Sequence, residues 1–494
     1  MKYKSTRSTD GILIDSAEAI KNGLAADGGL YMPQFIPTLT EEELESLIEC
    51  PYAQRAAYIF AKYLTDYSIN EVLSDATAAY SEKRFPGGAA PIRDIDGRVT
   101  SLELWHGPTC AFKDMALQIM PRLLSRALVK TEEKRTAFIL VATSGDTGKA
   151  ALEGYRDIPQ IKIKVFYPID GVSRVQKLQM QTQLGNNVDV VGIYGNFDDA
   201  QSGVKRIFGD ADTARELDEN GVFLSSANSI NWGRLAPQIV YYVSAYCDMV
   251  AEGQISLGEK IDVCVPTGNF GNIFAAYLAK KMGLPIGKLI CASNQNNVLT
   301  DFIQTGTYDR NRAFHTTASP SMDILISSNL ERLLYLIAGS EKTAAYMAEL
   351  AKTGRYTVSK EELAEIQESF AAFYASEEDC FAALKDAYDT HGYLMDTHTA
   401  VGYHAACTYA KEAEEKRRIL LASTASPYKF ASSVLFALTG KNEAGELEAL
   451  DALSALTGTE IPAPLSHLDE KEVRFPAAIE AEAMKDSVLA FAKA

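Results

Sequence analysis

From about residue 97 onward, short apolar runs rich in β-branched residues alternate with helical segments, and this rhythm constrains the fold most. Strands are expected at 136–142, 161–167, 187–194, 222–226, 261–265, 288–292 and 418–422. Helices are expected between most of them, at 147–156, 173–184, 198–208, 233–251 and 271–282. This alternation predicts an α/β fold with parallel sheets covered by helices on both faces. Ligands of such sheets gather at the carboxyl ends of the strands.

The pattern divides the chain into four expected parts. Residues 1–95 form an N-terminal α+β domain, and 96–215 form a smaller α/β domain that holds Lys113 and the Ser144–Gly148 loop. Residues 216–440 form a larger α/β domain with a mainly helical insertion at 300–395, and 441–494 form a peripheral C-terminal segment. Within the insertion, helices are expected at 323–339, 341–352, 359–374 and 378–389.

Composition excludes several classes of function. The net charge of −17 argues against nucleic acid as a partner, because phosphate backbones require basic surfaces. The seven cysteines form no C-x-x-C pair and the six histidines show no metal-ligand spacing, so we expect no metal site and a reduced, cytoplasmic protein. No apolar run is long enough to span a membrane, and the first residues lead into no apolar signal core, so no membrane association is expected.

Lys113 stands at the first turn of a helix-like segment that follows the Gly107-Pro108 turn. Apolar residues surround it, among them Phe112 and Met115. Burial disfavours the ammonium form of lysine, so this side chain can become a nucleophilic amine that forms a Schiff base. The alternative is a surface lysine at a helix start.

Two other loops between a strand and a helix have the composition of anion sites. Ser144, Gly145, Asp146 and Thr147 offer hydroxyls and backbone N–H groups at a helix N-terminus, which suits a substrate carboxylate. A tight turn with Asp146 or Thr147 as helix cap is the alternative. The run from Gly268 to Asn272 lets backbone amides approach a phosphate closely, but it matches neither nucleotide-binding glycine motif, and it could also be a plain connecting turn.

Two further positions carry candidate ligands. Thr424 follows the strand at 418–422, where a hydroxyl can meet a ring nitrogen, although an ordinary strand exit is equally compatible. Arg234 lies in the first turn of a helix, where a cation opposes the helix dipole. An anionic substrate group would explain that position, and an exposed arginine is the alternative.

These features together resemble the threonine synthases of the bacterial and fungal long form, which are pyridoxal 5'-phosphate enzymes of the tryptophan synthase β fold type (fold type II). The resemblance covers almost the whole chain. It rests on the motifs GLAADGGLY (23–31), HGPTCAFKD (106–114), ATSGDTG (142–148), NSINWGR (228–234), PTGNFGN (266–272), SMDILISSNLERL (321–333), GYLMDTHTAVG (392–402) and TASPYKF (424–430).

The resemblance implies a role for each candidate residue. Lys113 would form the Schiff base with the cofactor, and Phe112 would pack near the cofactor ring. The cofactor phosphate would be held by Gly268, Asn269, Phe270, Gly271 and Asn272, and Thr424 would bind the pyridine nitrogen. The α-carboxylate of the substrate would lie on Ser144, Gly145, Asp146 and Thr147, and its phosphate on Arg234 and Lys149. The family often has histidine where this chain has Ser426, which weakens any acid–base role for that position.

The implied activity is that of a carbon–oxygen lyase acting on phosphates. It converts O-phospho-L-homoserine and water to L-threonine and phosphate, the last step of threonine biosynthesis, in a monomer or homodimer. Other outcomes are a phospho-lyase that yields 2-oxobutyrate, an amino-acid dehydratase, and a non-catalytic relative that binds the cofactor. The Arg234 segment argues against the dehydratase, and the retained Lys113, Thr424 and PTGNFGN loop argue against the non-catalytic relative.

Overall fold

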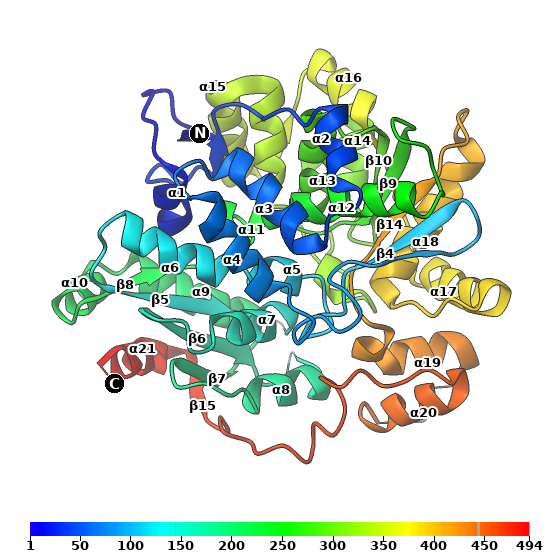
Figure 1. Ribbon diagram of the computed structural model, residues 1–494. Coiled ribbons are helices and arrows are strands. Elements are labelled where there is room, and N and C mark those ends of the chain that lie inside the picture. Colours follow the sequence, from blue (N-terminus) through cyan, green and yellow to red (C-terminus); the bar gives the residue numbers. More distant parts are fainter. Residues whose placement is uncertain (144, 171, 442–444, 494) are drawn as a thin grey trace.

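Two sheets form the framework of the protein (Figure 1). The computed structural model describes residues 1–143, 145–170, 172–441 and 445–493. Within these residues the larger sheet has six strands, in the order β13 (Phe370–Tyr374), β10 (Ile286–Ser293), β9 (Ile261–Pro266), β14 (Ile419–Ser423), β4 (Val99–Glu103) and β3 (Ile92–Asp94). The edge strand β3 is antiparallel to β4, and the other neighbours are parallel.

The smaller sheet is parallel throughout the described residues. Its order is β15 (Ala478–Glu480), β7 (Val188–Tyr194), β6 (Ile161–Pro168), β5 (Thr136–Ala142) and β8 (Val222–Ser225). The seven strands expected from the sequence are all present within two residues of their expected ends. The expected α/β class with parallel sheets is therefore confirmed.

Helices cover both faces of the smaller sheet. One face packs on α6 (Met120–Lys130) and α7 (Asp146–Tyr155), and the other on α9 (Phe197–Gly209), α10 (Ala211–Glu219) and α21 (Met484–Lys493). Successive residues of β5 alternate between the two cores, since Phe138 belongs to the core that contains Val488 and Ile139 to the core that contains Leu124. Helix α8 (Arg174–Gln181) follows β6 and contacts α7.

The larger sheet is covered in the same way. Helices α12 (Pro237–Ala251) and α13 (Gly271–Met282) share one core with β9, and α17 (Glu377–His391), α18 (Thr397–Glu412) and α19 (Ala431–Thr439) share the other. Val263 and Val265 face the first core, and Cys264 faces the second. Alternating residues of β9 are thus buried on both sides, as a central parallel strand requires.

The N-terminal part packs against helices that cover each of the two sheets. It contains the antiparallel pair β1 (Tyr3–Ser5) and β2 (Tyr31–Pro33) with α1 (Ser16–Asn22), α2 (Glu41–Leu47), α3 (Tyr52–Tyr63) and α4 (Ile69–Ala79). Reciprocal capping bonds between Thr40 and Glu43 begin α2, and bonds between Ser68 and Glu71 begin α4. Helix α3 contacts α12, and α1 contacts α6.

The region 300–395 differs from its expected helices. Its elements are α14 (Val298–Thr305), β11 (Thr307–Asp309), η1 (Pro320–Met322), α15 (Leu330–Thr353), β12 (Arg355–Thr357), α16 (Lys360–Ser369), β13 and α17. Residues 323–329 are not helical, and α15 bends at Gly339, whose φ is +77°. The helix expected at 359–374 ends at Ser369, because Phe370–Tyr374 pair with β10 as strand β13.

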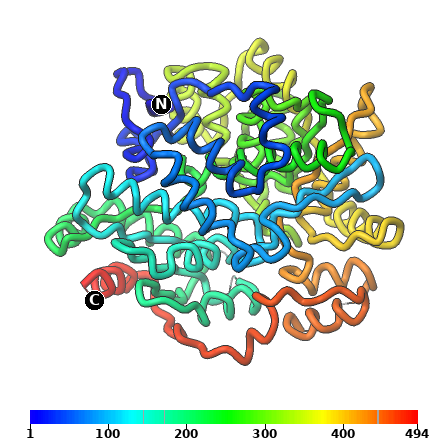
Figure 2. The backbone as a smooth tube through the Cα atoms, in the orientation of Figure 1, coloured from blue at the N-terminus to red at the C-terminus, as the bar shows by residue number. Residues whose placement is uncertain are grey.

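Strand pairing also crosses the expected domain limits. Strand β4 precedes Lys113 but belongs to the larger sheet, and β8 extends the smaller sheet past residue 215. After α20 (Glu448–Thr457) the chain crosses back to the smaller sheet and adds β15 to β7, as the orange-to-red trace of Figure 2 shows. In the described parts of the chain, none of the helices combines the length and apolar character that a membrane span needs.

Candidate active site

Three neighbouring strands of the larger sheet end where the predicted residues lie. The loop at 267–270 follows β9, Thr424 follows β14, and the Lys113 segment follows β4. The last two segments are bonded to each other, because Phe112 N donates to Thr424 O (2.8 Å) and Ser426 N donates to Cys110 O (3.0 Å). The sheet order therefore brings these segments, distant in sequence, to one edge.

Lys113 is the N-cap residue of the short helix α5 (Asp114–Leu117), and its side chain is 11% exposed. Its Nζ donates to Ser321 Oγ (3.2 Å), lies 3.6 Å from Asp146 Oδ2, and lies 5.2 Å from the centroid of the Phe112 ring. Burial lowers the pKa of Lys113, and the nearby Arg234 and Lys429 lower it further, while Asp146 opposes them. The lowered pKa makes the neutral, nucleophilic form of this amine more accessible than that of a lysine in water.

A second lysine, Lys429, completes the charge pattern around Asp146. Its fully buried Nζ lies 3.0 Å from Asp146 Oδ1 and donates to Thr109 O (2.7 Å). Although burial raises the pKa of Asp146, Lys429 and Lys113 bring that pKa below its usual value. The Asp146 carboxylate thus acts as counter-charge to two lysines, which leaves it poorly suited to contact a second carboxylate directly.

The loop between β5 and α7 begins the helix at Asp146. Ser144, one of the predicted carboxylate ligands, lies outside the described residues. Gly145 has φ +141°, and a Cβ on it would lie 2.4 Å from the Gln176 side chain, so the position requires glycine. Thr143 Oγ1 accepts from the N–H groups of Gly145 and Gly148 (both 3.0 Å). Thr147 is partly buried in the first turn of α7, at the positive end of the helix dipole.

The loop between β9 and α13 forms a tightly held cradle. Phe270 adopts a left-handed conformation (φ +62°) directly before Gly271, the first residue of α13. A Cβ on Gly268 would lie 2.7 Å from Ser321 O, so a larger residue there would displace the neighbouring loop. Asn329 Nδ2 donates to Asn269 O (3.0 Å) and thereby fixes the loop from outside.

Asn272 supplies an unused donor in the first turn of α13. Its Oδ1 accepts from the hydroxyls of Tyr241 and Tyr242, which leaves the amide nitrogen free to point elsewhere. That buried Nδ2 has no hydrogen-bond partner within the described part of the chain. A helix N-terminus with close backbone approach and a spare buried donor fits a phosphate group.

Arg234 is a buried cation that has no acidic partner in the described part of the chain. It lies in α11 (Trp232–Leu235), is 6% exposed, and donates to Ala227 O (2.7 Å). Among the described residues it forms no ion pair, and burial lowers its pKa to about 10. A buried charge of this kind calls for an anionic ligand.

Lys149, the other candidate for the substrate phosphate, already has partners. Its Nζ donates to Gln183 Oε1 and lies 3.6 Å from Glu153 Oε2. Burial lowers the pKa of Lys149 to about 8, against the opposing effect of Glu153. Arg234 is therefore the better-placed of the two cations for binding an anion.

Sequence reasoning missed three residues that lie at this site. They are Lys429, Ser321 and His398, which accepts a bond from Ser321 N (3.1 Å). The segments 321–333, 392–402 and 424–430 were recognised as motifs, but only the sheet order brings these side chains toward Lys113. His106, at the start of the motif that contains Lys113, lies 2.8 Å from Glu103.

Ser426, where the family often has histidine, has a structural role here. Its side chain accepts from Tyr428 N (3.3 Å) and caps η2 (Pro427–Phe430). The chain thus has a histidine at the site, but from α18 instead of this turn.

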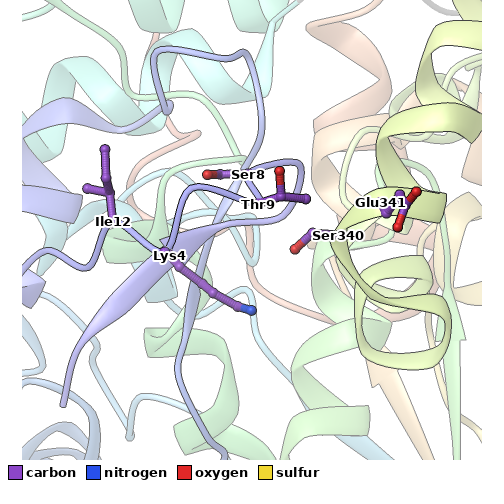
Figure 3. Close-up of a pocket in the computed structure, with 7 residues that line it drawn as sticks. Lys4, Ser8, Thr9, Ile12, Ser340 and Glu341 are labelled. Atoms are coloured by element: carbon purple, nitrogen blue, oxygen red, sulfur yellow. The ribbon is translucent and has the colours of Figure 1, made fainter.

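A separate hollow of about 300 Å³ lies on the surface between the N-terminal segment and the bend of α15 (Figure 3). Its lining residues are Lys4, Ser8, Thr9, Gly11, Ile12, Ser340 and Glu341. None of the predicted site residues lines it. The described residues contain no group of three or more histidine, cysteine, aspartate or glutamate side chains that could hold a metal ion.

Comparison with protein families gave three matches along the chain. Residues 94–425 match the model described as pyridoxal-phosphate dependent enzyme. Residues 2–80 match the threonine synthase N terminus, and residues 399–488 match the threonine synthase C-terminal model.

Individual proteins agree with these matches. Threonine synthase of Pseudomonas aeruginosa is 37% identical over 482 residues, which cover 96% of this chain and 95% of that protein. Human threonine synthase-like 1 is 44% identical over 437 residues, and this alignment covers 85% of the chain but only 58% of the human protein. The crystal structure of pyridoxal-phosphate-bound threonine synthase from Brucella melitensis superposes with a TM-score of 0.88 at 34% identity, covering 100% of both chains.

Proposed function

The chain belongs to the threonine synthase family of pyridoxal-phosphate-dependent enzymes, and from this premise we propose that it converts O-phospho-L-homoserine and water to L-threonine and phosphate. The observation that supports the proposal is the buried Lys113 amine, which bonds Ser321 beside Gly268 of the loop at 267–270 and lies near Arg234, a cation with no acidic partner among the described residues. The unpaired state of all seven cysteines supports the expected cytoplasmic location. The proposal also includes the oligomeric state, which we expect to be a monomer or a homodimer.

The residues present fit pyridoxal phosphate. Lys113 would attach it, Gly268 to Asn272 would hold its phosphate, Thr424 would meet its ring nitrogen, and Phe112 would pack beside the ring. When bound, the cofactor supplies an aldehyde for amines and a ring system that stabilises negative charge developing next to the substrate's amino group.

The chain's own groups then handle protons and anions. With the substrate bound, the free Lys113 amine takes the proton from Cα, which its lowered pKa permits. Arg234, with Lys149, holds the phosphate and stabilises it as it leaves Cγ. The N-terminus of α7, with Ser144, Gly145 and Thr147, would hold the α-carboxylate, while the Asp146 carboxylate faces Lys113 and Lys429 instead.

The remaining steps move protons and add water to complete the conversion to threonine. A further proton leaves Cβ, one is added at Cγ, and water adds its hydroxyl at Cβ while Cα regains a proton. The departing phosphate can carry protons between these positions, since it remains next to Arg234. Closure of the two sheets on each other keeps other water out until the addition step.

Product analysis tests the function. The purified chain is incubated with pyridoxal phosphate and O-phospho-L-homoserine, and threonine, phosphate and 2-oxobutyrate are measured. Equal amounts of threonine and phosphate are expected. Phosphate with 2-oxobutyrate would identify a phospho-lyase instead, and no phosphate release would contradict any reaction of this substrate.

Lys113→Ala tests the role of the amine. We expect borohydride to link no cofactor to this variant and turnover to fall by about three orders of magnitude or more. Lys83→Ala, which removes an exposed lysine, serves as the control. Turnover near the wild-type rate in Lys113→Ala would refute the assignment.

A further inference from the structure

Ser321 lies where three parts of the site meet. Its Oγ accepts from Lys113 Nζ (3.2 Å), and its carbonyl lies against Gly268 of the phosphate cradle. Its N–H donates to His398 Nε2 (3.1 Å). Ser321 belongs to the three-residue turn η1, which is too short to hold its own position, so the neighbours determine where the hydroxyl points.

His398 can accept this bond in only one tautomer. A backbone N–H always donates, so Nε2 carries no proton and the ring proton is on Nδ1. Nδ1 lies 2.7 Å from Asp396 Oδ2 and donates to it. The carboxylate of Asp396 therefore keeps the ring proton on Nδ1 and leaves Nε2 of His398 free to accept from Ser321.

Asp396 is itself rigidly held. It is fully buried at the N-cap of α18, where its carboxylate accepts from the backbone N–H groups of His398 (2.9 Å) and Thr399 (3.1 Å). The neighbouring Thr397 Oγ1 donates to Ala318 O (2.6 Å), and the His398 ring packs against Phe430, 4.8 Å between centroids. The start of α18 thus supports the whole turn that carries Ser321.

We propose that Ser321 is the positioning residue for the Lys113 amine, and that Asp396 and His398 act through it. By accepting one N–H of the amine, the hydroxyl restricts rotation of the lysine side chain and would hold the amine in one orientation for attachment of the cofactor. The inference deepens the proposed function and rests on Lys113 as the lysine that attaches the cofactor. It assigns a role to the segment 392–402, which the reaction steps above leave unused.

The rate at which pyridoxal phosphate becomes attached to Lys113 measures this role without any substrate. The full-length protein is freed of cofactor and mixed with pyridoxal phosphate, and the product is fixed by borohydride at timed intervals and mapped to Lys113. We expect Ser321→Ala and His398→Leu to slow attachment about tenfold, as for the loss of one well-placed hydrogen bond.

Two variants separate positioning from general support. His398→Gln keeps an acceptor that can reach Ser321 N, so it is expected to restore most of the rate. Asp396→Asn presents an N–H to Nδ1, moves the ring proton to Nε2 and sets two donors against each other, so it is expected to be as slow as His398→Leu. His404→Gln, on the same helix but outside the site, is the matched control and is expected to be unchanged.

Each outcome decides one point. If wild-type protein attaches pyridoxal phosphate elsewhere than Lys113, the proposed function fails and not this inference alone. If wild type reacts at Lys113 and Ser321→Ala reacts equally fast, Ser321 has no positioning role. If His398→Gln is as slow as His398→Leu, the effect is merely structural and the inference is overturned.

Discussion

A few buried basic residues give the candidate site a positive character, although the protein as a whole is strongly acidic. Lys113, Lys429 and Arg234 are buried near one another, and Asp146 is the carboxylate that pairs with the two lysines. The net charge of −17 repels anions at a distance, so attraction for a doubly anionic substrate has to come from these few groups at short range. Their substitution is expected to affect binding before it affects folding.

For Arg234→Ala we expect the KM for O-phospho-L-homoserine to rise about 10- to 100-fold, because a buried charge-assisted contact is lost. Arg234→Lys is expected to recover part of the affinity. Steady-state kinetics at saturating pyridoxal phosphate measure both. An unchanged KM in Arg234→Ala would move phosphate recognition to another residue.

If Lys149 binds the substrate phosphate as proposed, substrate affinity is expected to depend on pH. Burial lowers the pKa of Lys149 to about 8, so its charged ammonium predominates below pH 8 and the neutral amine above it. The KM of the wild type is therefore expected to rise between pH 7 and pH 9. Lys149→Gln is expected to show a higher KM at pH 7 and a flatter profile. Parallel profiles in the two proteins would exclude Lys149 from phosphate binding.

At the scale of helices and strands, α5 follows Lys113 directly and contacts α7, which covers the smaller sheet. This contact joins the Lys113 segment to the smaller sheet. Gly154 of α7 approaches α5 so closely that a Cβ would lie 1.8 Å from Leu117 O. Helix α5 begins at Asp114, directly after Lys113. A change in helix spacing here is therefore transmitted to the lysine.

Gly154→Ala is expected to cost about 1–3 kcal/mol of stability, because overpacking against backbone cannot be relieved by rotating a side chain. Gly209→Ala is the control, since a Cβ at Gly209 meets no atom within 4 Å. The midpoint of urea unfolding is measured for both. Equal midpoints would show that α5 and α7 can separate without loss.

The same scale shows what could be predicted from the sequence. Strands such as β5 and β9 were located correctly because each is a compact apolar run bounded by polar turns. The sequence predicts helix for strand β13 (Phe-Ala-Ala-Phe-Tyr), and this prediction is wrong. Its residues suit a helix or a strand, and the pairing with β10 decides for the strand. Strand β15 was missed because three residues carry too little pattern.

The residues of the candidate site could also be predicted from the sequence only in part. Lys113, Arg234 and the loop at 268–272 are placed by local strand-loop-helix patterns, and their roles remain part of the proposal. Lys429, Ser321 and His398 acquire their positions only through tertiary contacts with distant segments. No local pattern distinguishes such residues from ordinary polar positions.

Across the whole molecule, Arg332 joins three parts of the chain. Its buried guanidinium donates to Tyr31 O (3.2 Å) of β2 and to Ile230 O (2.5 Å), near Arg234. It also donates to Asn329, which holds the phosphate cradle at Asn269. These hydrogen bonds thereby link the N-terminal part to the loop at 267–270 and to the segment before Arg234, the two proposed anion-binding regions.

Arg332→Met is expected to lower stability by about 2–4 kcal/mol, because two buried carbonyls lose their donor. It is also expected to weaken binding of pyridoxal phosphate. Arg215→Ala, which removes an exposed ion pair with Asp212, is expected to change stability by less than about 1 kcal/mol. Thermal unfolding and cofactor titration measure the effects, and stability equal to that of Arg215→Ala would contradict the coupling.

The late addition of β15 to β7 has a consequence for synthesis. On the ribosome, β7 emerges after β3 and β4 but before the other four strands of the larger sheet, and its partner at Ala478–Glu480 emerges only after that sheet is complete. Until then Val188, Val190 and Ile193 form part of an open strand edge, which can pair with the same edge of another nascent chain. The edge of β7 is therefore expected to stay open to other nascent chains until residues 478–480 are translated.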